Sequence, residues 1–293
     1  VINDIVSDDI PGIVLLVEKP QTRFLGSAGV SNLQTQRAMQ VGDTIPTASI
    51  GKKMIALLAA QLADEGLLML DNTLDTWLSE SILSRITNSR QMTFRQLLNH
   101  TSGIFNYADV DDGEAYTELL LAEPEVLKTD IDFLELIFDH PSYFLPGEGY
   151  EYSNSGYSLA ALIMDDVLGE HHSVAMRNRF FDPLGMTATY YKGSEASLGD
   201  FVSGYLTTDD GEQLDTRPFL INTSQANSPV VSSVEDMAAF LKSLITDDSF
   251  ANEAVKNTLF GEDNLITQGA NEKAVLVIDI VIVDGNTVYA NAG

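Results

Sequence analysis

The sequence predicts an α/β fold of the α+β kind, with an antiparallel sheet flanked by helices and a mainly helical lobe inserted between its strands. Short apolar runs rich in β-branched residues stand at both ends of the chain, at residues 13–17, 24–30, 274–283 and 287–292. Between these runs, apolar residues recur mostly at helical spacing. Because strands come first, helices fill the middle and strands return, we expect one sheet built from both ends of the chain.

Length and composition fit a single domain made of two lobes. The 293 residues, 44% of them hydrophobic, are enough for a buried core. We expect an α/β lobe from residues 1–50 and 270–293 and a mainly helical lobe from residues 51–269. The most apolar run, residues 274–283, is about half as long as a bilayer requires and contains Asp279. No membrane span is therefore expected.

Turn and stop residues mark the first elements. Pro11 and Gly12 precede the first strand, and residues 19–22 are predicted to form the turn of a hairpin. A helix over residues 52–65 follows from the spacing of its apolar residues, and Gly66 is its predicted stop.

Further helices follow from the same periodicity. Thr93 is a predicted N-cap, and Gly169 is a predicted helix stop. The expected helices span residues 93–100, 114–127, 130–138, 156–168, 174–181 and 233–244. Near the end, Asp284, Gly285 and Asn286 predict a second hairpin between the last two strands.

The charge balance is strongly acidic. Lysine and arginine number 16 and aspartate and glutamate 43, which leaves a formal net charge of −27. This excess argues against nucleic acids and anionic membranes as partners. It would suit a salty environment, where bound cations screen the repulsion between acidic groups.

Cysteine and metal chemistry find little support. There are no cysteines, so disulfides and thiolate sites are excluded. The four histidines, His100, His140, His171 and His172, lack metal-ligand spacing, and the last two are expected to be exposed. We expect neither a metal nor an organic cofactor.

The most informative motif is an S-x-x-K at Ser49 and Lys52, where a helix is predicted to begin. Residues three apart on a helix lie on one face, so the lysine amine can take a proton from the serine hydroxyl. The helix N-terminus favours developing negative charge near Ser49, and Gly51 leaves room beside it. The alternative is an ordinary helix start, with Ser49 as a cap and Lys52 in solvent.

The neighbouring segments make the pattern specific. The S-x-x-K motif is followed, roughly 100 residues later, by Tyr152-Ser153-Asn154. With the segments 47–52, 67–71, 93–103, 146–157, 183–186 and 232–237, in this order, the chain resembles the serine β-lactamase and DD-peptidase superfamily. The resemblance is to the branch of class C β-lactamases, D-alanyl-D-alanine carboxypeptidases and related esterases.

The resemblance implies an acyl-transfer site. Ser49 would attack a carbonyl and form an acyl-enzyme, while Lys52 and Tyr152 together would handle the proton. Asn154 would bind the substrate amide and position Lys52. His100 would be structural, although its His-Thr-Ser-Gly context also allows a catalytic histidine.

The implied function is that of a serine hydrolase acting on β-lactams or D-alanyl-D-alanine-type peptides. Such an enzyme would be periplasmic or secreted, with a small molecule or a peptide as its partner. A carboxylesterase on the same fold is the alternative enzyme. A non-catalytic, penicillin-binding-like protein is the alternative from another class.

The third motif of the superfamily, K-T-G or H-x-G, aligns with Asn291-Ala292-Gly293. Asn291 stands where a lysine or histidine would meet a substrate carboxylate, which disfavours carboxylate-bearing substrates. The resemblance places Asn291 and Gly293 in the substrate site. It places the second oxyanion donor on the residue after Gly293, which lies beyond the 293 residues.

The family's further strands and its C-terminal helix also fall beyond Gly293, which would leave a gap in the sheet. We expect a part of a longer protein, a truncated chain completed by a partner or by self-association, or an inactive relative. The intact first two motifs favour the first two of these alternatives.

Overall fold

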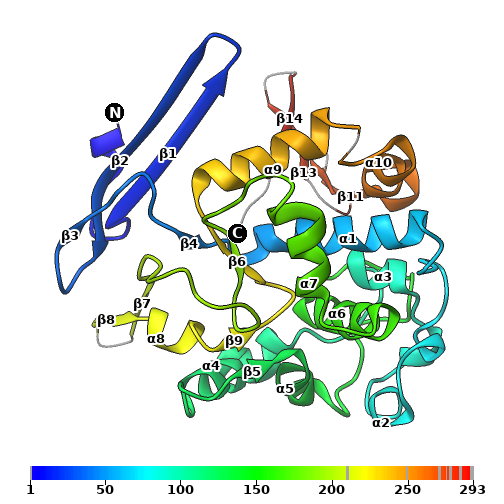
Figure 1. Cartoon of the computed structure of the whole chain (residues 1–293). Helices are drawn as coiled ribbons and strands as arrows, with labels where there is room; N and C mark the ends of the chain where they lie inside the picture. The colour runs from blue at the N-terminus through cyan, green and yellow to red at the C-terminus, as the bar shows by residue number, and fades with distance from the viewer. Residues whose placement is uncertain are drawn as a thin grey trace.

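The computed structural model describes residues 2–208, 211–248, 250–269, 272–274, 276, 279–283 and 286–290. Helices and strands mix in the order expected for the predicted α/β class (Figure 1). The strands are β1 (Gly12–Lys19), β2 (Thr22–Asn32), β3 (Arg37–Ala38), β4 (Ile45–Pro46), β5 (Lys128–Thr129), β6 (Tyr190–Tyr191), β7 (Tyr205–Thr207), β8 (Gln213–Asp215), β9 (Thr223–Ser224), β10 (Val230–Ser232), β11 (Ile266–Gly269), β12 (Glu272–Ala274), β13 (Asp279–Val283) and β14 (Asn286–Ala290). The helices are α1 (Lys52–Asp64), α2 (Glu80–Leu83), α3 (Phe94–Leu98), α4 (Glu114–Leu121), α5 (Asp130–Leu134), α6 (Asn154–Leu168), α7 (His172–Met176), α8 (Arg217–Leu220), α9 (Val234–Thr246) and α10 (Glu253–Phe260).

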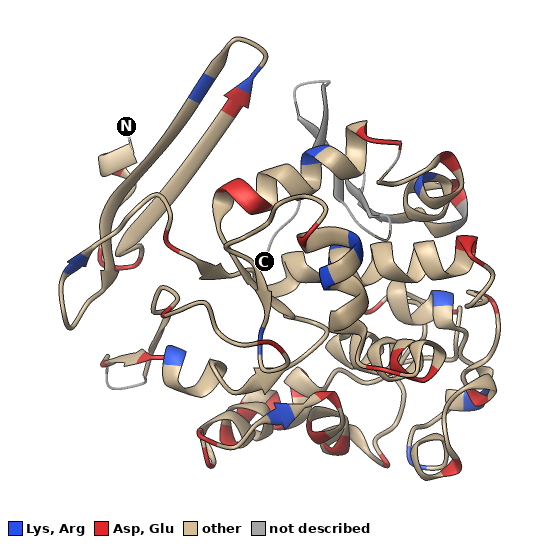
Figure 2. Cartoon of the chain, in the orientation of Figure 1, with Lys and Arg blue, Asp and Glu red and all other residues tan. Residues whose placement is uncertain are grey.

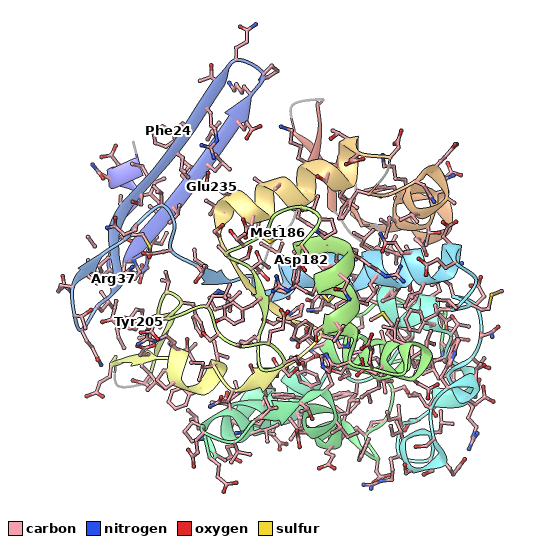
Figure 3. The ribbon with its side chains drawn as sticks, viewed as in Figure 1. Phe24, Arg37, Asp182, Met186, Tyr205 and Glu235 are labelled. Atoms are coloured by element: carbon pink, nitrogen blue, oxygen red, sulfur yellow. The ribbon has the colours of Figure 1, made fainter. Side chains whose placement is uncertain are left out.

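The predicted N-terminal hairpin is confirmed and is longer than expected. Strands β1 and β2 pair antiparallel, with Lys19 opposite Thr22 across a tight turn. The hairpin extends away from the helical body (Figure 1). Ion pairs to α9 tie it down, because Glu18 binds Lys242 and Arg23 binds Glu235. Figure 3 shows Phe24 on this hairpin and Glu235 near the start of α9.

The base of the hairpin is held from another side. The Tyr205 hydroxyl accepts a hydrogen bond from the Leu33 backbone N–H at 2.7 Å. Arg37 makes a two-pronged ion pair with Asp43, at 2.6 and 2.9 Å. Both labelled side chains, Arg37 and Tyr205, lie on the flank where β3 approaches β7 (Figure 3). These contacts set the direction in which the chain enters β4 and the segment that follows it.

The C-terminal strands form a sheet of their own, in the order β11–β12–β13–β14. The predicted hairpin between β13 and β14 is confirmed, with Val283 opposite Asn286. The expectation of one strand over residues 274–283 is wrong: β12 ends at Ala274, β13 begins at Asp279, and these two residues pair antiparallel. A continuous apolar run does not mark the point at which a strand reverses.

Strands from the two ends of the chain do not share a sheet among the described residues. One sheet contains β1, β2 and β3, and another contains β11 to β14. The expectation of a single sheet built from both ends is therefore not met in this part of the chain. The division into an α/β lobe and a helical lobe stays a prediction.

The helical body surrounds α1. Ile55, Leu57 and Leu58 of this helix are fully buried. Each such side chain contributes roughly 1.5–3 kcal/mol relative to an exposed one. Helix α6 packs beside α1 and against α3 and α5. This packing makes α1 a rigid support for the residue at its N-terminus.

Several helix boundaries agree with their predicted signals. Thr93 caps α3 in a capping box with Gln96, as expected. Gly169 ends α6 in a left-handed conformation, with φ of 69°. Helix α4 is shorter than predicted and ends at Leu121, because Glu123 has φ of 48° and Pro124 follows it.

Acidic residues are spread over the body of the molecule and basic ones are few (Figure 2). Among the described residues, no helix has both the length and the apolar character needed to cross a bilayer.

Candidate active site

A tight turn between β4 and α1 carries Ser49. It is a 3₁₀ turn over Ala48–Gly51, and Ala48 adopts a left-handed backbone with φ of 46°. Thr47 fixes the entry, because its N–H and hydroxyl both donate to the Val230 carbonyl at 2.9 and 3.0 Å. A Cβ at Gly51 would stand 2.5 Å from the Pro229 ring, so this position excludes a side chain. The strained turn and its supports present Ser49 at the head of α1.

The structure brings together the four residues expected from the first two motifs. Ser49 Oγ lies 3.0 Å from Lys52 Nζ and 2.8 Å from the Tyr152 hydroxyl. Lys52 Nζ in turn donates to Asn154 Oδ1 at 2.8 Å. The alternative of a solvated Lys52 is wrong, because this side chain is 2% exposed.

Burial and two hydrogen-bond acceptors surround the Lys52 amine. Burial, with a smaller effect of the Lys53 charge, holds the pKa of Lys52 well below its usual 10.5. Its amine donates to two groups that can only accept, Asn154 Oδ1 and the Asn227 backbone carbonyl, at 2.8 and 2.9 Å. A neutral amine has two N–H bonds and one lone pair. Once both N–H bonds are engaged, the lone pair faces the Ser49 hydroxyl.

Tyr152 approaches Ser49 from the other side. Its hydroxyl donates to Ser49 Oγ, and 37% of the residue is exposed. The Lys52 amine lies 4.9 Å from the centre of its ring. Tyr152 therefore links the buried lysine and the half-buried serine to the open side of the site.

His100 supports Tyr152 from behind. Its ring centre is 4.4 Å from that of Tyr152, and its Nδ1 accepts a hydrogen bond from the Ser153 N–H at 3.1 Å. Burial, with smaller effects of Lys52 and Lys53, lowers the pKa of His100 to about 3. His100 is therefore neutral at ordinary pH and holds the backbone of the second motif, as the structural interpretation predicts.

Two site residues were not foreseen. Asn106 Oδ1 accepts a hydrogen bond from the Asn154 N–H at 3.1 Å and so fixes the start of α6. Asn227 contributes its backbone carbonyl to Lys52. An asparagine in a loop and a main-chain oxygen carry no spacing signal, so the sequence alone offered no way to find them.

The predicted substrate-binding residues Asn291 and Gly293 lie outside the described residues. Their roles stay predictions.

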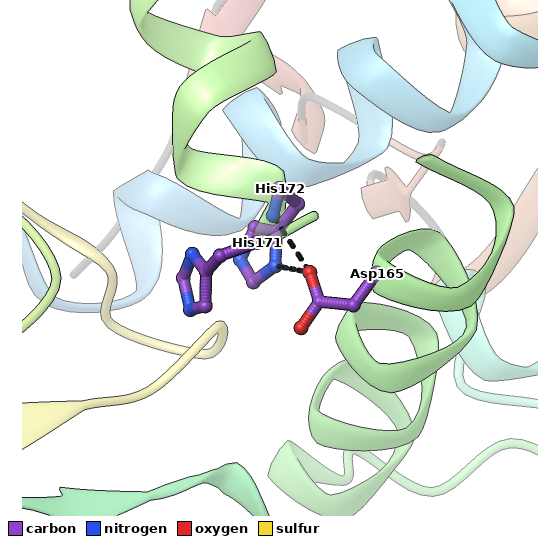
Figure 4. Close-up of side chains that lie close together, drawn as sticks. All are labelled: Asp165, His171 and His172. Carbon is purple, nitrogen blue, oxygen red and sulfur yellow. Dashed lines mark hydrogen bonds and ion pairs between the residues drawn. The ribbon is translucent and has the colours of Figure 1, made fainter. Parts of the chain in front are cut away.

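A second polar cluster lies at the junction of α6 and α7, where Asp165, His171 and His172 approach one another (Figure 4). Asp165 accepts from the backbone N–H and from Nδ1 of His172, at 2.6 and 2.8 Å. His172 Nε2 lies 2.7 Å from the Tyr191 hydroxyl. The expectation that His172 is exposed is wrong, because it is fully buried. Since both its ring nitrogens are engaged, the cluster braces the two helices.

Comparisons with known proteins identify the family of the chain. The beta-lactamase family model matches residues 3–273. Penicillin-binding protein 4* of Bacillus subtilis is 25% identical over 262 residues, which cover 85% of this chain and 55% of that protein. Lovastatin esterase of Penicillium rubens is 30% identical over 169 residues, which cover 53% of this chain and 41% of the esterase. The chain thus spans about half the length of the curated relatives it matches.

Solved structures show the same fold. The D-stereospecific amidohydrolase of a Streptomyces species superposes with a TM-score of 0.84 at 24% identity, covering 99% of this chain and 84% of that one. The penicillin-binding protein of Bacillus halodurans gives 0.78 at 23% identity, covering 94% and 80%. The match of the family model over nearly the whole chain shows that the protein belongs to the beta-lactamase family.

Proposed function

We propose that the chain is a serine hydrolase that forms an acyl-enzyme at Ser49. One observation carries the proposal: Ser49 Oγ is in hydrogen-bond contact with both the buried Lys52 amine and the Tyr152 hydroxyl, at 3.0 and 2.8 Å. A serine hydroxyl is a weak nucleophile until a neighbouring base takes its proton. Lys52 is that base, because its burial disfavours the ammonium form.

The acylation step follows from these contacts. Ser49 Oγ forms a bond to the substrate carbonyl carbon while its proton passes to Lys52 Nζ. The bond from that carbon to the leaving nitrogen or oxygen then breaks. Tyr152, placed on the open side of Ser49, supplies a proton to the departing group, and the proton on Lys52 restores it. Water attacking the ester reverses these transfers and frees Ser49.

The substrate class proposed first is a β-lactam or a D-alanyl-D-alanine-type peptide. Membership of the beta-lactamase family and the likeness to a penicillin-binding protein support it. A hydrolase of such peptides would work outside the cytoplasm, in the periplasm or after secretion. We treat residues 1–293 as one catalytic domain of two lobes, and self-association as a further proposal that light scattering can test.

A carboxylesterase is the second candidate. Asn291 brings no positive charge to the position where the resemblance puts a carboxylate-binding residue. One relative is an esterase, 30% identical to this chain over the matched residues. Neutral esters would not need the missing charge.

Intact-mass spectrometry tests the proposal directly. We expect benzylpenicillin or a fluorophosphonate to add its acyl or phosphonyl mass to the wild-type chain, and Ser49→Ala to remain unmodified. Faster turnover of p-nitrophenyl butyrate than acylation by penicillin would favour the esterase. If neither reagent modifies Ser49, the proposal fails and a non-catalytic binding protein becomes the better explanation.

A further inference from the structure

The turn that supplies the Asn227 carbonyl to Lys52 has an anchor outside the residues that contact Ser49. Strand β9 ends at Ser224, and the Lys192 N–H holds the Pro229 carbonyl at 2.8 Å. Between these two points the chain forms a turn closed by the Ser228 N–H on the Gln225 carbonyl, at 3.1 Å. The position of the Asn227 carbonyl depends on what holds this turn.

Two polar side-chain atoms of the turn do not anchor it. Gln225 Nε2 and Asn227 Oδ1 are buried and have no hydrogen-bond partner among the described residues. Asp130, the first residue of α5, anchors the turn instead. Both of its carboxylate oxygens face the Ala226 N–H, at 3.1 and 3.3 Å.

Asp130 is free for this contact because another residue caps its helix. Thr129 occupies the N-cap of α5, and its N–H and hydroxyl bond Asp132 Oδ2 at 2.7 and 2.8 Å. The Asp130 side chain turns inward and is 5% exposed. Strand β5, just before it, pairs with β9 and fixes α5 beside the turn, with Thr129 opposite Ser224.

We propose that Asp130 is a positioning residue: it holds the Ala226–Asn227 peptide unit, and through it one of the two acceptors that direct the Lys52 lone pair at Ser49. No described hydrogen bond joins Asp130 to Ser49, Lys52 or Tyr152, so it acts through the backbone. The inference rests on the proposed function.

The surroundings of Asp130 support a role other than stabilisation. Burial raises its pKa to about 7, although the Ser158 hydroxyl and, to a smaller extent, His172 and the Ala226 N–H lower it. The negative charge of Asp165 raises the pKa of Asp130 further. Besides burial, the charge of Asp130 in turn raises the pKa of two phenols: Tyr107 in η5, the 3₁₀ segment Tyr107–Gly113, and Tyr191 in β6. A carboxyl group in such a place costs stability when ionised. Its contact with the Ala226 N–H gives a functional reason for keeping a carboxylate at this buried position.

The test compares Asp130→Ala with Asp130→Asn, whose amide oxygen can still accept from the Ala226 N–H. The control is Asp165→Asn, which alters a half-buried carboxylate that contacts His172 at the α6–α7 junction. We expect Asp130→Ala to lower kcat for p-nitrophenyl butyrate by about 10- to 100-fold with little change in KM, which is the range for losing a hydrogen bond to a charged group. Asp130→Asn should retain activity within about threefold of the wild type.

The pH profile separates positioning from general destabilisation. An acceptor stabilises the ammonium form of Lys52, so losing it lowers the pKa of Lys52 further. The acid limb of kcat/KM should therefore move to lower pH in Asp130→Ala and stay in place in Asp165→Asn. Equal effects of Asp130→Ala and Asp165→Asn, or equal losses in Asp130→Ala and Asp130→Asn, would overturn the proposal.

Hydrogen exchange makes the result independent of activity. Amides of the segment 225–228 should exchange faster in Asp130→Ala than in the wild type, and at the wild-type rate in Asp165→Asn. If the wild type hydrolyses nothing, the proposed function fails while this measurement still decides whether Asp130 holds the turn. Unchanged exchange together with unchanged kcat would refute the positioning role.

Discussion

Lys192 offers a quantitative test of the structure, because it is a buried cation without a described partner. The residue follows β6 and is 2% exposed, and no described residue forms an ion pair or a hydrogen bond with its amine. Burial lowers its pKa from 10.5 to about 8. At about 1.4 kcal/mol per pKa unit, this shift corresponds to roughly 3 kcal/mol of lost stability at pH 7.

The perturbation is Lys192→Met, which keeps most of the side-chain volume and removes the charge. We expect the variant to be more stable than the wild type by about 2–3 kcal/mol at pH 7. The sign follows from proton binding: below pH 8 the amine is charged in both states and the folded state bears the full cost. As pH rises the folded state loses its proton first, so the difference shrinks to about 2 kcal/mol at pH 9 and disappears above pH 10.5.

Urea unfolding at pH 7 and pH 9, followed by circular dichroism, measures both quantities. Lys242→Met is the matched control, because this lysine is exposed and pairs with Glu18 on the surface. The control should change the urea midpoint little, and equally at the two pH values. A Lys192→Met variant that is less stable than the wild type at pH 7 would refute the reasoning, since the amine would then have a favourable partner in solution.

Three further changes probe the active site. Tyr152→Phe keeps the ring beside His100 but removes the hydroxyl on Ser49, so kcat should fall by about 10²- to 10⁴-fold at an unchanged melting temperature; a fall below tenfold would contradict its role as the proton donor. Asn154→Ala removes an acceptor from Lys52, which should lower the pKa of the amine further. The acid limb in the pH dependence of the rate of Ser49 phosphonylation by a fluorophosphonate should therefore move to lower pH. A shift to higher pH would argue against a neutral Lys52. In His100→Asn, the amide oxygen can still accept from the Ser153 N–H. This variant should lose less stability than the wild type as pH falls below 6.5, because between that pH and about 3 the wild-type histidine binds a proton only in the unfolded state. Equal decreases in melting temperature for the two proteins from pH 7 to pH 4 would contradict this.

Periodicity and end signals in the sequence predict most of the helical body. The helix over α1 follows from its apolar spacing, because one face must pack in the core. Thr93 marks the start of α3 through a capping box that the hydrogen bonds show. These features are local, so the residues that encode them stand next to one another in the chain.

Sequence reasoning failed where the outcome depends on distant partners. Residues 274–283 form parts of two strands, because the reversal between Ala274 and Asp279 is not visible in an apolar run. His172 was expected in solvent and lies buried, because Asp165 and Tyr191 satisfy both its ring nitrogens. No local pattern announces either arrangement.

The same distinction separates the predicted from the unpredicted half of the candidate site. The order of the motifs and the family resemblance made Ser49, Lys52, Tyr152 and Asn154 recognisable. Yet a lysine beside a serine could equally donate to it as an ammonium ion. In the proposed mechanism, Lys52 acts as a base because its N–H bonds are directed elsewhere, and one of the two groups that direct them is the backbone carbonyl of Asn227. Any residue at that position supplies the same oxygen, so only the fold of the turn determines where it lies. In the proposed mechanism, the contact of Asp130 with Ala226 therefore acts on Lys52 through the backbone, although nothing in the S-x-x-K pattern refers to it.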